Sequence, residues 1–215
     1  YFIARNLLVN FTEFKLNAQI LSGVKELGYE TATPIQEKAI PSILAGLDVV
    51  GTAQTGTGKT AAFALPLLQR LMDGPRGQLR GLILAPTREL AEQIRQSIDR
   101  LAIRTGLRCT AIYGGANLVK QYQILRRGVD IVIACPGRLL DHINRGNINL
   151  TQVEVLVLDE ADHMFDLGFR EPIYKIIRHL PKKRQNLLFS SSMSKEIRAL
   201  ADEILHKPDS IQIGE

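Results

Sequence analysis

Cysteine is scarce in this chain of 215 residues, in which Cys109 and Cys135 are the only two. Neither has another Cys or a His at metal-ligand spacing, which argues against structural zinc and favours a reducing compartment inside the cell over secretion. No apolar run reaches the roughly 18 residues of a membrane span, and the first residues include the charged Arg5 without the pattern of a cleavable signal peptide. We therefore expect a soluble, cytoplasmic protein without a membrane segment.

Internal repeats, low-complexity segments and Pro/Gly-rich linkers are absent as well, and 45% hydrophobic with 23% charged residues suits one globular domain over residues 1–215. Two small domains are the alternative. The 27 Lys+Arg against 22 Asp+Glu give a formal net charge of +5, which is compatible with a polyanionic partner, although basic charge is often only a solvated surface. The chain opens without Met and closes on the alternation Ser210-Ile211-Gln212-Ile213-Gly214. We expect a final strand there, and a monomeric fragment of a longer protein.

Short apolar segments with the composition of buried parallel strands lie at residues 49–50, 82–85, 110–113, 131–134, 155–158 and 186–189. Stretches with helical spacing follow them at residues 61–72, 89–103, 118–127, 138–143, 171–180 and 195–205. This alternation predicts right-handed crossovers and a three-layer α/β fold, with a central, mainly parallel sheet and helices on both faces. Such sheets bind ligands at the carboxyl ends of their strands. Residues 16–28 and 35–44 predict two more helices, outside the repeating unit.

A glycine-rich segment follows the first predicted strand and precedes a predicted helix, and it reads Ala53-Gln54-Thr55-Gly56-Thr57-Gly58-Lys59-Thr60. This context matches the Walker A motif, or P-loop, in which backbone N–H groups and the helix dipole bind phosphate. Lys59 is expected to reach the β- and γ-phosphates of a nucleotide, and Thr60 to hold Mg²⁺. Ala53 stands where the pattern has Gly, which reduces backbone freedom only at the loop entry. The alternative is a glycine-rich turn with an exposed lysine.

An acidic segment, Asp159-Glu160-Ala161-Asp162, directly follows the predicted strand at 155–158. This is the place of a Walker B motif, so Asp159 is expected to bind Mg²⁺ directly or through water, and Glu160 to orient and deprotonate the attacking water. Lys59, Asp159 and Glu160 are thus the expected catalytic residues. The alternative is an acidic helix N-terminus favoured by the helix dipole, which the accompanying Walker A loop disfavours.

The chain resembles the DEAD-box ATP-dependent RNA helicases of superfamily 2, whose signature joins D-E-A-D, here at 159–162, to A-Q-T-G-T-G-K-T, here at 53–60. The resemblance begins near residue 11 and implies the N-terminal RecA-like P-loop domain, with a core at 47–215 and an adenine-reading extension at 10–38. It implies ATP or ADP and Mg²⁺ as cofactors. Gln36 would bond the adenine edge, Phe11, seventeen residues before Gly28, would stack on the ring, and Tyr29 and Thr33 would shape the pocket. An amide pairs with N6 and N7 of adenine, which favours ATP over GTP; composition alone would make Gln36 a surface helix residue.

The resemblance also implies RNA contacts at three strand ends, through Pro86, Thr87 and Arg88, through Gly114 and Gly115, and through Pro136, Gly137 and Arg138. A hydroxyl and a cation at a helix start suit phosphate, and paired glycines permit close approach by a sugar-phosphate chain. Cys135 stands where the family has Thr, which removes a phosphate-binding hydroxyl and predicts a weaker contact. Singly, each segment is more often a helix cap or turn. Together they predict a surface that binds RNA backbone and 2′-hydroxyls without sequence specificity.

Ser190-Ser191-Ser192 departs from the Ser-Ala-Thr of the family. In the family this segment couples the nucleotide site to strand separation through the last Asp of D-E-A-D, here Asp162. Ser191 adds a hydroxyl that would cost about 1–3 kcal/mol if it were buried without a partner, so we expect it to find one or local packing to adjust. The departure bears on coupling and leaves the expectation of ATP binding intact.

The resemblance implies a second RecA-like domain, absent from this sequence, whose arginines would raise the rate of phosphoryl transfer by about 10³–10⁵. We expect this chain to bind adenine nucleotides, to bind RNA weakly, to hydrolyse ATP slowly and not to unwind RNA. One alternative is a P-loop ATPase of another class, such as a transporter or DNA-directed motor, which the Gln36 segment and D-E-A-D disfavour. The other is a non-catalytic RNA-binding adaptor with a relic nucleotide site, which the intact Lys59, Thr60, Asp159 and Glu160 disfavour.

Overall fold

The structure is a computed structural model that describes residues 9–214. The segment with Arg5, used above to argue against a signal peptide, lies outside this range. Within it the strands are β1 (Val49–Thr52), β2 (Gly81–Leu84), β3 (Cys109–Ile112), β4 (Ile131–Ala134), β5 (Val155–Leu158), β6 (Gln185–Ser190) and β7 (Asp209–Gln212). They form one sheet in the order β3-β4-β2-β5-β6-β1-β7, and every neighbouring pair is parallel. The sheet, expected to be mainly parallel, is parallel throughout the described residues.

The helices are η1 (Phe11–Phe14, a 3₁₀ turn), α1 (Ala18–Glu26), α2 (Pro34–Leu44), α3 (Lys59–Met72), α4 (Arg88–Leu101), α5 (Leu118–Arg126), α6 (Pro136–Asn144), α7 (Ala161–Asp166), α8 (Arg170–Ile177) and α9 (Lys195–Ile204). All the predicted strands and helices are present. The sequence reasoning missed η1 and α7, because four and six residues are too few to show a helical period. Across residues 9–214, no helix has the length and apolar character that a membrane span requires.

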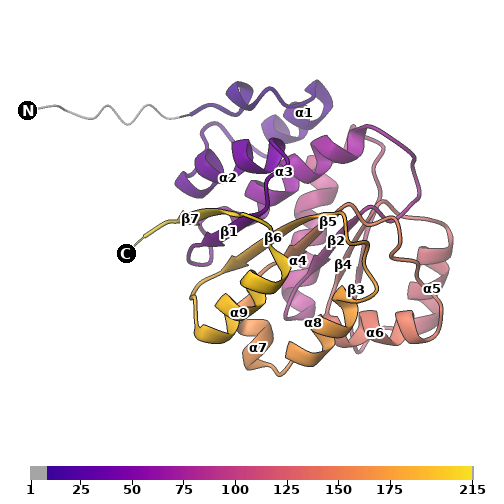
Figure 1. Ribbon diagram of the computed structural model, residues 1–215. Helices are drawn as coiled ribbons and strands as arrows, with labels where there is room; N and C mark the ends of the chain where they lie inside the picture. The colour runs from indigo at the N-terminus through magenta and orange to yellow at the C-terminus, as the bar shows by residue number, and fades with distance from the viewer. Residues whose placement is uncertain (1–8, 215) are drawn as a thin grey trace, which may run out of the picture.

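Two hydrophobic cores lie on opposite faces of the sheet, because successive strand residues point to opposite sides. Ile133 and Val157 belong to the core covered by α1 to α4, whereas Val132 and Leu156 belong to the core under α6 to α9. In Figure 1, α1, α2 and α3 lie above the sheet and α6, α7, α8 and α9 lie below it. Burial on both faces explains why β2, β4 and β5 are apolar at almost every position. The three-layer α/β fold is confirmed.

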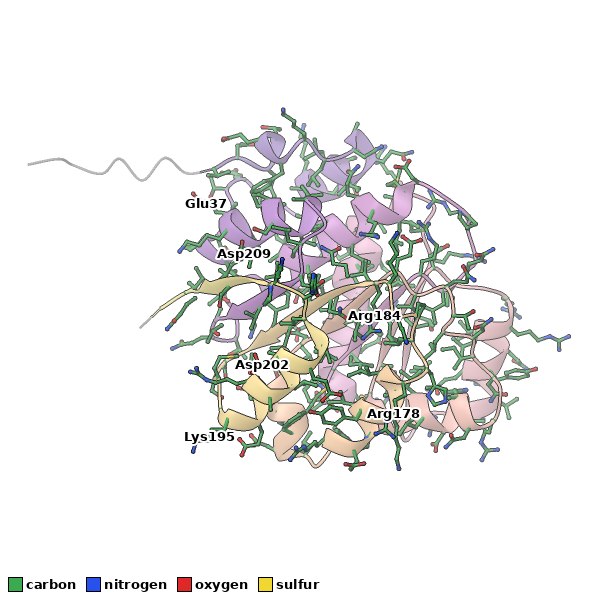
Figure 2. All side chains as sticks on the ribbon, viewed as in Figure 1. Glu37, Arg178, Arg184, Lys195, Asp202 and Asp209 are labelled. Carbon is green, nitrogen blue, oxygen red and sulfur yellow. The ribbon has the colours of Figure 1, made fainter. Side chains whose placement is uncertain are left out.

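Charged side chains lie on the outside of the covering helices. Glu37 on α2 and Lys195 and Asp202 on α9 are exposed and point away from the sheet (Figure 2). The functional candidates lie elsewhere. Since all the strands run the same way, the segments that follow β1, β2, β3, β4, β5 and β6 meet at one edge of the sheet, and these are the segments that the sequence singled out.

Candidate functional site

The P-loop joins β1 to α3, and its two middle glycines have backbone angles that other residues adopt only under strain. Gly56 has φ +79° and Gly58 has φ +93°. The turn aims α3 at the loop and buries Lys59, which is only 6% exposed. Its Nζ donates to the carbonyl of Ala53 at 3.0 Å. The alternative of a turn with an exposed lysine is therefore wrong.

Gln36 reaches the P-loop from α2. Its Nε2 donates to the carbonyl of Gly58 at 3.0 Å, and its Oε1 accepts from the N–H of Thr33 at 2.9 Å. The side chain is 4% exposed, so the alternative of a surface helix residue is wrong. The hydroxyl of Thr33 is the one buried side-chain oxygen or nitrogen without a hydrogen-bond partner among the described residues. Gln36 keeps one N–H and an acceptor lone pair beside Gly58, next to the buried hydroxyl of Thr33.

Phe11 and Tyr29 form an aromatic pair at the entrance to this region. Their rings stack with centroids 6.1 Å apart and an interplanar angle of 28°. Phe11 is only 2% exposed and Tyr29 is 39% exposed, so Tyr29 offers the open aromatic surface. A bridge between Asn10 and Thr31 and a bond from the N–H of Ala32 to Val9 at 2.8 Å hold the two segments together. Both rings also line a neighbouring cavity of about 760 Å³.

The P-loop and the acidic segment after β5 face each other across a cavity of about 260 Å³. It is lined by Tyr29, Thr55, Gly56, Gly58, Lys59, Thr60, Ala61, Leu90, Gln93, Ser97, Asp159 and Glu160. Asp159 is 2% exposed, and burial raises its pKa to about 6, a rise that the Lys59 ammonium opposes and the charge of Glu160 reinforces. Glu160 has φ +53°, an uncommon backbone conformation for a non-glycine residue, and such conformations cluster at functional sites. The structure thus brings the three predicted catalytic residues into one cavity.

The oxygen atoms in this cavity suit magnesium. Thr60 supplies a hydroxyl and Asp159 a carboxylate, which are the hard donors that Mg²⁺ takes together with waters and the phosphates of a substrate. Within residues 9–214, the His, Cys, Asp and Glu side chains form no cluster of three that could hold a metal by themselves. The protein donors therefore fit a cation that arrives with a phosphate ligand, and do not form a closed metal cage.

Asp162, in the first turn of α7, lies beside the end of β6. The segment Ser190-Ser191-Ser192, here called the serine segment, surrounds it. Its Oδ2 accepts from the N–H of Ser191 at 3.1 Å, from the N–H of Ser192 at 3.0 Å and from both hydroxyls. Its own N–H donates to the hydroxyl of Ser190 at 3.3 Å. Burial raises the pKa of Asp162, but the hydrogen bonds from the serines lower it by more, so the pKa lies below its ordinary value. The added hydroxyl of Ser191 is exposed and has found a partner, so it carries no burial penalty.

The three predicted RNA segments also lie together at the carboxyl edge. Thr87 caps α4 by accepting from the N–H of Leu90 at 3.2 Å, and the guanidinium of Arg88 lies 5.0 Å from the centre of the Tyr113 ring. Gly114, Gly115 and Gly137 are exposed, whereas Pro136 is buried. Arg138 is largely turned inward. Its side chain is 13% exposed, and Nη1 donates to the carbonyl of Ala116 at 2.9 Å.

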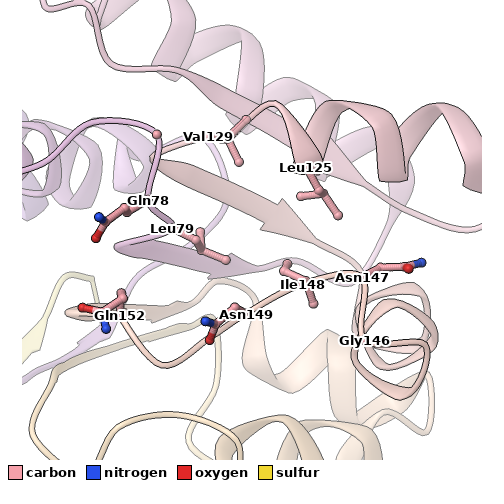
Figure 3. A pocket seen from close by; sticks show the side chains of 11 residues that line it. Gln78, Leu79, Leu125, Val129, Gly146, Asn147, Ile148, Asn149 and Gln152 are labelled. Atoms are coloured by element: carbon pink, nitrogen blue, oxygen red, sulfur yellow. The ribbon is translucent and has the colours of Figure 1, made fainter.

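The sequence reasoning missed Gln121 and His142, which are buried beneath this surface. A signal was available, because Gln121 lies three residues after Leu118 and four before Leu125, and His142 lies three after Leu139. These spacings place both polar residues on the apolar faces of their helices. The sequence also gave no hint of a cavity of about 740 Å³ at the opposite edge of the sheet, where the strands begin. Gln78, Asn147, Asn149 and Gln152 are among the residues that line it (Figure 3). None of the predicted site residues lines that cavity.

A parallel sheet with a P-loop after β1 and an acidic segment after β5 defines the RecA-like class of P-loop domains. Residues 33–200 match the model of the family described as DEAD/DEAH box helicase, and the chain belongs to that family.

Curated relatives agree with this assignment. ATP-dependent RNA helicase CshA of Listeria monocytogenes is 45% identical over 206 residues, which are 96% of this chain and 39% of that protein. The CshA protein of Limosilactobacillus reuteri is 43% identical over 95% of this chain and 41% of its own length. The chain thus spans about two fifths of the length of these relatives.

Solved structures show the same fold. A DEAD box protein from Methanococcus jannaschii superposes with a TM-score of 0.89 at 40% identity, over 94% of this chain and 55% of that one. A hypothetical ATP-dependent RNA helicase from Sulfolobus tokodaii superposes with a TM-score of 0.86 at 34% identity, over 92% of this chain and 57% of that one.

Proposed function

We propose that this chain is the nucleotide-binding RecA-like domain of an ATP-dependent RNA helicase, and that it binds Mg-ATP or Mg-ADP and the backbone of RNA. The observation that carries the proposal is one cavity lined by Lys59, Thr60, Asp159 and Glu160, beside a buried Gln36 that is bonded to the P-loop. A cation, two carboxylates and a hydroxyl around one small space suit a triphosphate with its metal.

Each of these residues has a proposed role. The N–H groups of Gln54 to Thr60 would surround the phosphates, and Lys59 would exchange its bond to Ala53 for phosphate oxygens. Glu160 would orient the attacking water and accept its proton. Thr60 and Asp159 would hold Mg²⁺, which when bound neutralises charge on the phosphate oxygens.

The base would be recognised beside Gly58. The free N–H and acceptor lone pair of Gln36 match N7 and N6 of adenine, and guanine reverses the polarity at position six. The buried, unpartnered hydroxyl of Thr33 lies at the same place, 3.0 Å from where a Cβ on Gly58 would be, and would bond the ligand after a small movement of the side chain. The resemblance gives the stacking role to Phe11, but Phe11 is buried behind Tyr29, so we assign the face of the ring to Tyr29.

RNA would cross the carboxyl edge over the segments at 86–88, 114–115 and 136–138. The bonds between Asp162 and the serine segment would pass the state of the nucleotide site to this surface. Complete helicases of this family are expected to use a second RecA-like domain to supply arginines and finish the RNA groove. We therefore expect the chain alone to hydrolyse ATP slowly and to leave duplexes intact; robust unwinding by this chain would contradict the proposal.

The test is an equilibrium titration with fluorescent ADP and GDP in Mg²⁺, for wild type, Gln36→Ala and Lys59→Ala. We expect wild type to prefer ADP, Gln36→Ala to lose that preference, and Lys59→Ala to bind both nucleotides weakly. The GDP arm is the internal control, because a variant that only loosened the P-loop would weaken ADP and GDP equally. Equal binding of both nucleotides by wild type would return P-loop ATPases of other classes to contention, and binding without any ATP turnover on adding RNA and the second domain would favour an adaptor.

A further inference from the structure

Two buried polar side chains link the segments of the proposed RNA surface. Gln121 on α5 is 6% exposed and His142 on α6 is fully buried. The Nε2 of Gln121 donates to the carbonyl of Tyr113 at 3.1 Å. Its Oε1 accepts from Nη1 of Arg138 at 3.0 Å and lies 3.1 Å from Nε2 of His142. One amide therefore joins the end of β3 to α5 and α6.

The partners of His142 assign its proton. Its Nδ1 lies 3.3 Å from Nδ2 of Asn147, an amide nitrogen that can only donate, so Nδ1 is the acceptor. Nε2 then carries the hydrogen and donates to Oε1 of Gln121. Burial and the nearby Arg138 lower the pKa of His142, which agrees with a neutral ring. Asn147 itself lies at the rim of the cavity in Figure 3, so the chain of bonds runs through the domain from one edge of the sheet to the other.

Arg138 completes the connection. Besides its bond to Gln121, the same Nη1 donates to the carbonyl of Ala116 at 2.9 Å, and Nε lies 3.6 Å from a carboxylate oxygen of Asp141. Nη1 of Arg138 is thus occupied by two protein acceptors. Tyr113, whose carbonyl Gln121 holds, carries the ring over which Arg88 lies. Contacts of this one cluster thus reach all three proposed RNA segments, the one at 86–88 only through the ring of Tyr113.

We propose that Gln121 and His142 are positioning residues for RNA, and that Arg138 acts with them by fixing the loop at 113–116 through the two hydrogen bonds of its Nη1. The inference rests on the proposed RNA-binding function. Without the cluster, the loop that carries Gly114 and Gly115 would lose its hydrogen bonds, and Tyr113 and Arg88 would no longer be held in one position. RNA affinity would fall because the contact surface would have to be ordered on binding. The nucleotide cavity shares no residue with the cluster, so ADP affinity would stay unchanged.

The experiment measures binding of fluorescein-labelled oligouridylate by fluorescence anisotropy at one fixed salt concentration, with fluorescent ADP as the report of an intact fold. Gln121→Glu keeps the acceptor for Arg138 and His142 but loses the donor to Tyr113, and we expect a roughly three- to tenfold higher Kd for RNA. The matched control is Gln123→Glu, which adds the same charge at an exposed position of the same helix. We expect it to change the Kd by less than about twofold.

Two variants of His142 separate hydrogen bonding from packing. His142→Gln keeps a donor near Nε2 and should bind RNA within about twofold of wild type, whereas His142→Phe keeps the ring volume and should bind roughly three- to tenfold more weakly. The opposite order would show that the ring only fills space and would overturn the proposal. Arg138→Lys keeps the charge at a partly exposed position, but its side chain is shorter and lacks the planar fork that places Nη1 between Ala116 and Gln121. We expect the same loss of RNA affinity, and undiminished binding would mean that Arg138 acts by its charge.

The results also separate this inference from the proposed function. Wild type that binds ADP but not RNA would refute RNA binding by this chain and the inference with it. Wild type that binds RNA as tightly as Gln121→Glu and His142→Phe would refute the inference alone. If a buried variant loses ADP binding as well, its fold has failed, and Arg138→Lys against wild type decides the question.

Discussion

Replacing Gly58 by alanine tests the contact between the P-loop and the Gln36 side chain. A Cβ at this position would lie 2.5 Å from Nε2 of Gln36 and 3.0 Å from Oγ1 of Thr33. Gly56, in the same loop, offers a matched control, because it also has a positive φ but a Cβ there would meet nothing within 4 Å. Gly58→Ala therefore combines backbone strain with a collision, whereas Gly56→Ala produces strain alone.

The magnitudes follow from these two terms. A non-glycine residue at positive φ costs about 1–2 kcal/mol, which applies to both variants. Moving Gln36 aside breaks its two buried hydrogen bonds, at a net cost of about 1–3 kcal/mol that applies only to Gly58→Ala. At about 2 kcal/mol, and roughly 2–4 °C per kcal/mol for a chain of this size, we expect Tm to fall roughly 4–8 °C further for Gly58→Ala than for Gly56→Ala.

Thermal and urea unfolding of both variants, in the wild-type and Gln36→Ala backgrounds, is the assay. Gln36→Ala removes the nearer obstacle, so the difference between the two glycine variants should shrink to less than about 1 kcal/mol in that background. The reasoning is refuted if the two variants are equally stable in the wild-type background, or if their difference persists without Gln36.

Other perturbations have equally specific outcomes. Ser191→Ala removes an exposed donor to Asp162, so we expect urea unfolding to register a loss below about 1 kcal/mol with ADP affinity unchanged, and a larger loss would contradict the exposed geometry. Asp48 is buried and accepts from two backbone N–H groups at 2.8 Å, so Asp48→Ala should lose about 2–4 kcal/mol in urea. Burial and Arg138 lower the pKa of His142, so the folded state binds that proton less readily than the unfolded state. The neutral ring therefore contributes its full stability above the pKa of about 6.5 that a histidine has in the unfolded chain. As the pH falls from there towards the lower pKa of the folded state, the free energy of unfolding decreases by up to about 1.4 kcal/mol per pH unit. Lowering the pH from ~7.5 to ~5.5 should therefore reduce the free energy of unfolding more for wild type than for His142→Gln. Equal reductions would contradict a neutral buried ring.

The strands could be predicted from the sequence because the physical signal is local. A strand buried on both faces must be apolar at nearly every position, as β4 and β5 are, and its ends follow from the same residues. The parallel arrangement then places the segments after each strand at one edge, so the neighbourhood of Lys59 and Asp159 followed from topology alone. Short elements such as α7 escaped because six residues show no period.

Side-chain partners could not be predicted in the same way. Whether Gln36 faces solvent or Gly58, 22 residues away, depends on how α2 packs against α3. The fate of the extra hydroxyl of Ser191 depended on an acceptor 29 residues away, at Asp162. The inward turn of Arg138 likewise depends on acceptors supplied by another helix and loop. Distances along the chain carry little information on such contacts, because they are made only after the layers have assembled.

Ser190 gives a way to watch the two loops of the nucleotide site at once. It ends the strand that lies between β1 and β5, and it is fully buried. Its carbonyl accepts from the N–H of Ala53 at 3.1 Å, and its hydroxyl accepts from the N–H of Asp162 at 3.3 Å. A single isotope-labelled serine therefore holds two spectroscopic reporters, the carbonyl carbon for the P-loop and the hydroxymethyl group for the acidic segment. In an NMR titration with Mg-ADP, a shift of the carbonyl signal would report a change at the P-loop, and a shift of the hydroxymethyl signal would report a change at the acidic segment.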